Sequence, residues 1–181
     1  MESTTKPLRV AIAGLGAIGK SLATRLTEGV VPGVVLTAVS AKNQDKAKEF
    51  VGTLGYPVKV LPISELEPEA DVVVECAPAE LLSDIVAPFL RAKKKAIVLS
   101  VGAILFKPEL IELAKTTGGK IMVPTGALIG LDAMVAAAEG EIFSVKMVTN
   151  KPPLGLKGAP HLIENNTSVD GLTEPLKVFS G

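Results

Sequence analysis

A glycine loop near the amino terminus has the most specific chemistry in the sequence. Gly14-Leu-Gly-Ala-Ile-Gly19 fits the pattern G-x-G-x-x-G, directly after the apolar run Leu8–Ala13 and before an amphipathic stretch. In that context the first glycine permits a tight turn, the second lets the backbone approach a pyrophosphate, and the third lets a helix pack close to a strand. The amino terminus of that helix offers free N–H groups to phosphates. The loop therefore predicts a site for a nicotinamide dinucleotide, NAD or NADP, at Gly14, Gly16, Ala17, Ile18 and Gly19; the alternative is a glycine-rich turn without a ligand.

The residues after the second apolar run bear on which dinucleotide is bound. Sites selective for NAD usually hold Asp or Glu about 20 residues after the glycine loop, bonded to the ribose 2′-hydroxyl. Ala38-Val-Ser-Ala-Lys-Asn43 has no carboxylate. Ser40 could donate to a 2′-phosphate and Lys42 could neutralise it, and the equal alternative is a Lys42 that points into solvent. We therefore expect NADPH to bind at least as well as NADH.

Six short apolar runs are the expected strands that position this loop. They alternate with amphipathic stretches, which is the rhythm of βαβ units around a parallel sheet covered on both faces. The expected strands are Leu8–Ala13, Val34–Val39, Val58–Leu61, Asp71–Glu75, Ala96–Ser100 and Lys120–Val123. This inventory predicts the α/β class, with a Rossmann-type doubly wound parallel sheet.

Further contacts to the dinucleotide are expected where the other strands end. In an open α/β sheet, ligands bind beyond the carboxyl ends of the strands. The small residues placed there are Cys76, Ala77 and Pro78 after the fourth strand, and Ser100, Val101 and Gly102 after the fifth. Cys76 is interpreted as a small buried residue rather than a nucleophile. Glu75 is interpreted as a hydrogen-bonded structural carboxylate rather than a catalytic group.

The sequence changes character after about residue 128. A helix is expected over Leu131–Ala138 and a strand over Ile142–Thr149, where buried and exposed residue types alternate. No firm element is expected after Lys151-Pro-Pro153. We predict a dinucleotide-binding Rossmann domain over residues 1–128, followed by a partial mixed α/β domain over 129–181 that is an incomplete substrate or catalytic domain.

Charge and hydropathy argue against several classes of partner. The chain of 181 residues has 19 basic and 19 acidic side chains, only 3% aromatic residues and no Trp, which disfavours nucleic acid. No apolar run approaches the ~18 residues of a membrane span, and no signal peptide is apparent. A single cysteine fits a reducing compartment. We expect a cytoplasmic protein with a small-molecule substrate, without a metal, nucleic-acid or membrane partner.

Five stretches of the sequence resemble the L-aspartate dehydrogenase family. They are Arg9–Gly19, Asp71–Pro78, Leu99–Ala103, Pro124–Asp132 and Lys151–Pro153, of which the last two are the most specific. The resemblance implies an enzyme, commonly a homodimer, that oxidises L-aspartate with NAD or NADP. Its product would be iminoaspartate, which is hydrolysed to oxaloacetate and ammonia or used in NAD biosynthesis. It also implies that Ala127 contacts the cofactor.

The resemblance leaves the catalytic residues unassigned. Members of the family have a catalytic histidine in a later stretch that has no counterpart in this sequence. We therefore expect this chain to bind cofactor without turnover. His161 does not match that motif and is expected in a loop or on the surface. Thr125 and Lys151 are candidate substrate contacts; the alternatives are a helix cap and an exposed lysine. Two other functions stay open: a related dihydrodipicolinate or homoserine-type oxidoreductase, and a non-catalytic dinucleotide-binding fragment or pseudoenzyme.

Overall fold

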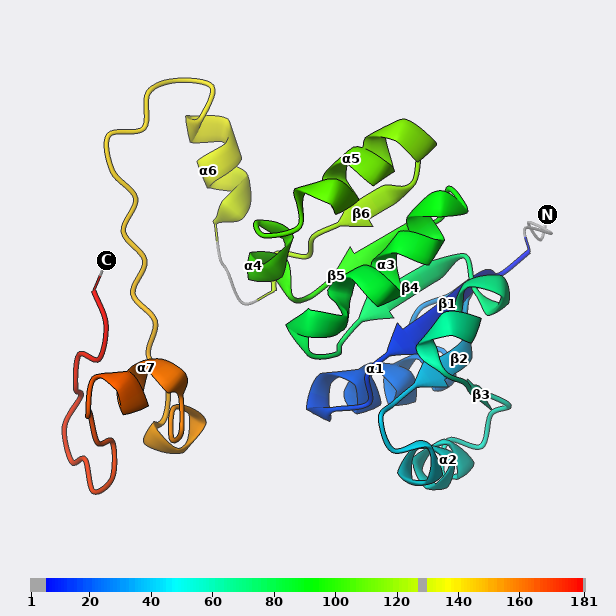
Figure 1. Ribbon diagram of the computed structural model, residues 1–181, viewed down its shortest axis with the longest axis horizontal. Helices are drawn as coiled ribbons and strands as arrows, with labels where there is room; N and C mark the ends of the chain where they lie inside the picture. Colours follow the sequence, from blue (N-terminus) through cyan, green and yellow to red (C-terminus); the bar gives the residue numbers. More distant parts are fainter. Residues whose placement is uncertain (1–5, 127–129, 181) are drawn as a thin grey trace. The chain divides into compact units, whose positions relative to one another are not determined.

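Residues 6–126 and 130–180 are described by the computed structural model (Figure 1). The chain divides into two units, Met1–Ile129 and Gly130–Gly181, and each is considered by itself below. Across the described ranges, no helix combines the length and the apolar character needed to cross a bilayer.

A parallel sheet lies at the centre of the amino-terminal unit. Its six strands follow the order β3-β2-β1-β4-β5-β6, and every neighbouring pair is parallel. The strands are β1 (Leu8–Ala13), β2 (Val34–Ser40), β3 (Lys59–Val60), β4 (Val72–Glu75), β5 (Lys95–Val98) and β6 (Lys120–Met122). In this order the chain leaves β1 in one direction and returns to its other side, so the switch point lies between β1 and β4. The predicted Rossmann-type doubly wound sheet is confirmed.

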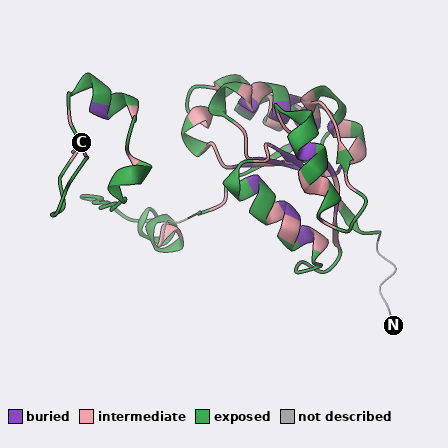
Figure 2. Cartoon of the chain, turned by 90° about the horizontal axis from the view of Figure 1, so that it is seen from below, coloured by how far each residue is buried: buried purple, intermediate pink, exposed green. Residues whose placement is uncertain are grey.

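Helices cover both faces of the sheet, and alternation along β1 explains how. Val10 and Ile12 belong to one buried cluster, with α1 (Ala17–Thr27) and α2 (Gln44–Gly52). Ala11 and Ala13 belong to the other cluster, which contains the buried side chains of α3 (Leu82–Arg91) and α5 (Pro108–Thr117). Successive strand residues point to opposite faces, so an uninterrupted apolar strand supplies both layers. Figure 2 shows this buried interior between the helical layers.

Short helices complete the connections of this unit. They are η1 (Ile63–Glu65), η2 (Glu67–Glu69), η3 (Ala79–Leu81) and α4 (Val101–Ile104). The link from β3 to β4 therefore contains only 3₁₀ turns, anchored in the core by Leu66 and Ala70.

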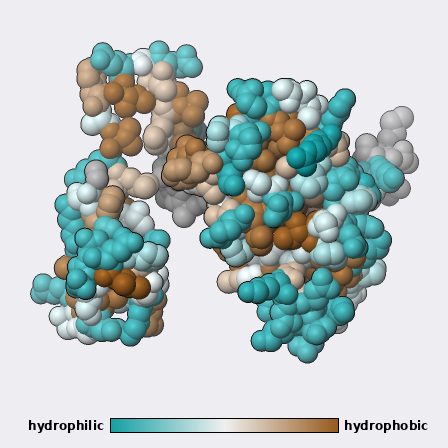
Figure 3. Space-filling model, viewed as in Figure 1, coloured by the Kyte–Doolittle hydropathy of each residue, from teal (hydrophilic) through white to brown (hydrophobic). Residues whose placement is uncertain are grey.

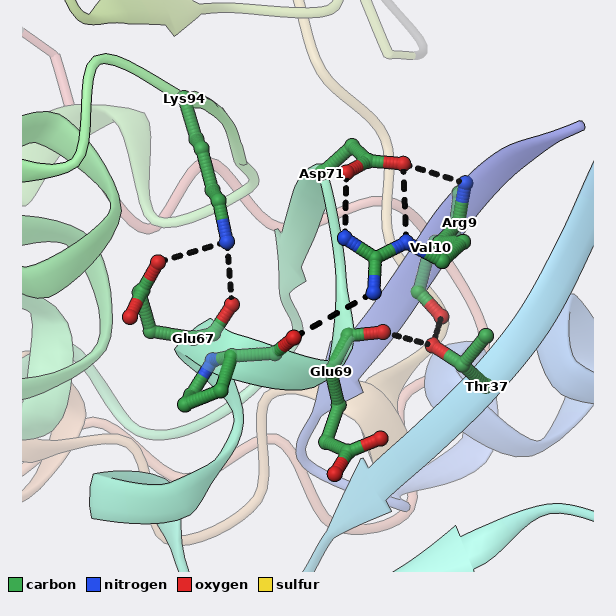
Figure 4. A network of polar contacts seen from close by, with 8 residues as sticks. Arg9, Val10, Thr37, Glu67, Glu69, Asp71 and Lys94 are labelled. Carbon is green, nitrogen blue, oxygen red and sulfur yellow. Dashed lines mark hydrogen bonds and ion pairs between the residues drawn. The ribbon is translucent and has the colours of Figure 1, made fainter. Parts of the chain in front are cut away.

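A polar network fixes this link at the amino ends of the strands (Figure 4). The Arg9 guanidinium donates to both oxygens of Asp71, at 2.7 and 3.2 Å, and to the Pro68 carbonyl at 3.3 Å. Lys94 Nζ lies 2.6 Å from both the backbone carbonyl and the carboxylate of Glu67. The guanidinium of Arg9 holds the pKa of Asp71 below its ordinary value. These contacts lie at the opposite end of β1 from the glycine loop, so we interpret them as structural.

Several strand ends differ from the prediction by one or two residues. The clearest case is β5, which ends at Val98 rather than at Ser100. The N–H groups of Leu99 and Ser100 donate to the Glu75 carboxylate instead of continuing the ladder. The reason is therefore a side-chain acceptor at the end of the neighbouring strand, which a pattern of apolar residues does not reveal.

The carboxy-terminal unit contains three short helical segments. They are α6 (Leu131–Ala137), η4 (Pro153–Gly155) and α7 (Pro160–Glu164). The helix expected over Leu131–Ala138 is confirmed. The expectation of no firm element after Lys151 was wrong for α7, where Pro160 occupies the first turn and Leu162 is buried. A proline is well suited to that position because its missing N–H would have no partner there.

The strand predicted over Ile142–Thr149 was wrong. This segment has no regular structure, and Phe143 and Met147 are 88% and 71% exposed. A strand requires a partner for its backbone N–H and C=O groups. Within residues 130–180 no such partner strand is present. Apolar side chains therefore lie on the surface of this unit, as Figure 3 shows.

Candidate functional site

The glycine loop joins β1 to α1 through close backbone contacts. Gly14 has φ +104°, and its N–H donates to the Ser40 carbonyl at 2.8 Å. A Cβ on Gly14 would overlap the Cys76 carbonyl, and a Cβ on Gly19 would overlap the Gly14 carbonyl. Both glycines are therefore required by packing, as the motif predicts for a tight turn and a close helix.

Gly16 differs from the other two because it faces open space. It is the N-cap of α1, with φ −73°, and no atom lies within 4 Å of the place where a Cβ would be. No packing or φ angle requires glycine here. The empty position fits the close approach of a ligand to the backbone at the amino end of α1, so the residues present fit the phosphates of a dinucleotide.

Glu75 braces the two loops that follow β4 and β5. Its side chain is fully buried and accepts hydrogen bonds from the N–H groups of Ala77, Leu99 and Ser100, at 2.9–3.1 Å, and from Ser100 Oγ at 3.1 Å. The predicted hydrogen bonding of Glu75 is confirmed, and its structural rather than catalytic role stays a prediction. The same contacts occupy both donors of Ser100, so this serine supports the loop rather than offering a donor to a ligand.

A cleft of about 1420 Å³ lies at the carboxyl ends of the strands. Its volume exceeds the ~300–1000 Å³ of ordinary small-molecule pockets, which suits an extended ligand. The cleft is lined by these predicted residues: Gly14, Gly16, Ser40, Lys42, Cys76, Ala77 and Pro78. Segments that are far apart in the sequence therefore meet where the strand order predicts a ligand.

The other predicted residues lie outside this cleft. Ala17 and Ile18 are exposed on the first turn of α1, and Gly19 is buried beneath it. Val101 and Gly102 are exposed in α4. Ala127 lies outside the described residues.

Cys76 is half-buried at the wall of the cleft. Burial, together with the charge of Glu75, raises the pKa of its thiol to about 11. The thiolate is the nucleophilic form and is scarce at neutral pH under these conditions. The interpretation of Cys76 as a packing residue agrees with this environment.

The candidate substrate residues and His161 are all exposed. Thr125 follows β6, and it does not cap a helix, because the N-cap of α6 is Gly130; that alternative was wrong. Lys151 lines a separate cavity of about 460 Å³ within the carboxy-terminal unit. His161 lies on the surface, as predicted, but in α7 rather than in a loop, 3.2 Å from the Val178 carbonyl.

Sequence reasoning missed several residues of the cleft. Lys46 is the most informative, because it is a second cation on the same side of the cleft as Lys42, in the first turn of α2. Lys20 also lines the cleft and follows the glycine loop directly. Ile63 and Leu81 supply apolar surface from the links after β3 and β4, and no local pattern identifies them.

The family comparison agrees with the geometry of the amino-terminal unit. Residues 14–124 match the family model described as homoserine dehydrogenase, NAD binding domain. This range begins at the first glycine of the loop and ends just after β6.

Curated relatives match beyond that range. The chain is 56% identical over 179 residues to an L-aspartate dehydrogenase of Bordetella bronchiseptica, a match that covers 99% of this chain and 66% of the relative. It is 51% identical over 180 residues to one of Bradyrhizobium diazoefficiens, covering 99% of this chain and 64% of the relative. The chain thus spans slightly less than two thirds of the length of these relatives.

Solved structures resemble the chain in fold. An NAD binding oxidoreductase of Klebsiella pneumoniae superposes with a TM-score of 0.58 at 22% identity, covering 77% of this chain and 40% of that one. A scyllo-inositol dehydrogenase of Lactobacillus casei with bound NAD(H) gives 0.56 at 17% identity, covering 74% and 41%. The predicted resemblance to L-aspartate dehydrogenases is confirmed, and the chain belongs to the family of NAD-binding domains described for homoserine dehydrogenase.

Proposed function

We propose that this chain forms the dinucleotide-binding part of an L-aspartate dehydrogenase that uses NAD or NADP. The observation that carries the proposal is the 56% identity to such an enzyme, which extends through 99% of the chain rather than stopping with the glycine loop. The proposal assigns residues 1–128 to cofactor binding and 129–181 to part of a substrate domain. It also includes a cytoplasmic location and a homodimer.

The amino-terminal unit would hold the cofactor through backbone rather than side chains. Gly16 leaves the amino end of α1 open to the pyrophosphate, while Gly14 and Gly19 keep the turn compact. Ala77 and Pro78 line the wall, and Glu75 fixes that wall by accepting the Ala77 N–H. Ala17, Ile18, Val101, Gly102 and Ala127 complete the proposed contacts. The bound cofactor supplies the acceptor for the hydride that leaves the substrate carbon.

Two residues are proposed as substrate contacts, Thr125 and Lys151. L-aspartate carries two carboxylates, and an ammonium group near the site would pair with one of them. Lys151 is exposed and lines a cavity in the carboxy-terminal unit, and Thr125 is exposed at the end of β6. Loss of the substrate's ammonium proton needs a base, and no residue described here is assigned that role.

A second candidate function is a homoserine-type oxidoreductase. The match of residues 14–124 to the homoserine dehydrogenase NAD binding domain favours it. Both candidates need the same cofactor cleft, so only the substrate separates them.

The test has a binding step and a turnover step. The purified chain is titrated with NADH and NADPH, followed by their fluorescence, and then incubated with NAD or NADP and L-aspartate, D-aspartate or L-homoserine. Reduction of the cofactor with L-aspartate alone supports the first candidate, and reduction with L-homoserine supports the second. Binding without turnover on any substrate is the result expected of a dinucleotide-binding part on its own, and no binding of either dinucleotide refutes the proposal.

A further inference from the structure

We propose that Lys42 and Lys46 bind the 2′-phosphate of NADP, so that this chain binds NADP(H) in preference to NAD(H). This inference rests on the proposed dinucleotide function and specifies which dinucleotide the cleft selects. It concerns one wall of the cleft, which we call the β2–α2 wall and define as Ser40–Lys46.

The β2–α2 wall brings two cations to the cleft. Lys42 precedes α2, and Lys46 lies in its first turn, four residues later. Both line the cleft, and both are otherwise exposed. Both lysines line the same cleft beyond the end of β2, so their ammonium groups can approach one phosphate bound there. Ser40 adds a hydroxyl at the end of β2, where the residue is only 3% exposed.

The same wall presents no carboxylate to the cleft within the described residues. Asp45 is the acidic residue of this segment, and it does not line the cleft; its carboxylate lies 3.8 Å from Lys48 Nζ. The carboxylates that do line the cleft, Glu80 and Asp84, come from the links and helix after β4. An NAD-selective site holds a carboxylate at the end of its second strand. In this chain the second strand ends at Ser40, so a serine stands where that carboxylate would be.

These charges distinguish the two cofactors by a single group. A phosphate monoester carries nearly two negative charges at neutral pH, whereas the ribose 2′-hydroxyl of NAD is uncharged. Two ammonium contacts therefore stabilise bound NADP and contribute little to bound NAD. Exposed ion pairs are weak individually, so the expected preference is about tenfold.

Direct titration tests the preference without any need for turnover. The chain is titrated with NADPH and NADH, and with adenosine 2′,5′-bisphosphate and adenosine 5′-monophosphate, at low and high salt. We expect the 2′-phosphorylated member of each pair to bind about tenfold more tightly, with an advantage that shrinks as salt screens the contacts.

Two lysine variants separate the wall from general charge effects. In the double variant Lys42→Ala, Lys46→Ala, NADPH should weaken about tenfold while NADH changes less than about twofold. Lys48→Ala is the matched control, because Lys48 lies in the same helix, is exposed and does not line the cleft. It should leave both affinities unchanged.

The outcomes separate this inference from the proposed function. Equal affinity for NADPH and NADH, or an unchanged ratio in the double variant, overturns the inference and leaves the dinucleotide function standing. A preference for NADH also overturns the inference. Failure to bind either dinucleotide overturns both.

Discussion

Alanine substitution at two glycines of one loop should separate folding from ligand binding. A Cβ at Gly19 would overlap the Gly14 carbonyl oxygen and lie 3.0 Å from its carbon and 3.5 Å from an Ile12 methyl. The Gly14 backbone cannot easily shift away from this Cβ, because its N–H donates a hydrogen bond to the Ser40 carbonyl. Overpacking of this kind costs about 3 kcal/mol. For a chain of this size, that is a fall in Tm of about 6–12 °C.

Gly16→Ala should have the opposite effect. Its Cβ meets no protein atom within 4 Å and φ is −73°, so the folded state accepts the methyl group. The small loss from replacing a glycine N-cap and the gain from a stiffer unfolded chain are each about 1 kcal/mol or less and nearly cancel. The methyl group would instead occupy the space where the proposed pyrophosphate approaches. A cost of about 1–3 kcal/mol there is a loss of about 5- to 150-fold in affinity.

Thermal unfolding followed by circular dichroism and titration with NADPH measure the two effects on the same samples. The expected pattern is a low Tm for Gly19→Ala, and a normal Tm with weak binding for Gly16→Ala. If both variants melt like the parent, the close packing at Gly19 is wrong. If Gly16→Ala binds NADPH as tightly as the parent, the cofactor does not lie against the amino end of α1.

Three further predictions concern individual side chains. Glu75→Gln should lower the free energy of unfolding by about 2–4 kcal/mol in urea titrations, because an amide NH₂ would face N–H donors that now meet a carboxylate oxygen; an unchanged stability would contradict the bracing role. Asp71→Asn should cost about 1 kcal/mol at pH 7, since the carboxylate is partly exposed. The contacts with Arg9 lower the pKa of Asp71, so their contribution is present above the ordinary pKa of an aspartate near 3.8 and is lost as the pH falls through the lower folded-state value. Parent and variant should therefore converge in urea titrations at acid pH, and a gap that stays constant down to pH 2 would disprove the linkage. Cys76 should react slowly with a thiol reagent, since a pKa of about 11 leaves about one thiol in a thousand ionised at pH 8; rapid reaction at that pH would contradict its environment.

The sheet could be predicted from the sequence because its signals are local. Continuous apolar runs identify strands buried on both faces, and the G-x-G-x-x-G spacing identifies the first crossover. Strand order then follows from the fold, and it brings Cys76 to the same cleft as Ser40 and Lys42, although Cys76 is distant from both in the chain. Lys46 could have been found from the same topology, because the first turn of the helix that follows β2 lies at the same edge of the sheet.

The remaining features depend on contacts that a pattern does not contain. The early end of β5 is set by the Glu75 carboxylate on the neighbouring strand. Ser100 was predicted to touch the cofactor, yet its N–H and hydroxyl are occupied by that same carboxylate. Ile142–Thr149 has the alternation of a strand, but alternation describes only which face would be buried. Pairing requires another strand, and none lies within residues 130–180.

The link between β3 and β4 makes the two faces of the sheet differ in how added salt affects their stability. One layer is held by the apolar sides of α1 and α2, which salt does not weaken. The link across the other face depends in part on the ion pairs Arg9–Asp71 and Lys94–Glu67, which added salt screens. Hydrogen exchange of the η1 and η2 amides should accordingly speed up at high ionic strength while the amides of α1 stay protected. Such local opening would begin beside the Ile63 wall of the cleft, so the grip on the cofactor would loosen before the domain unfolds.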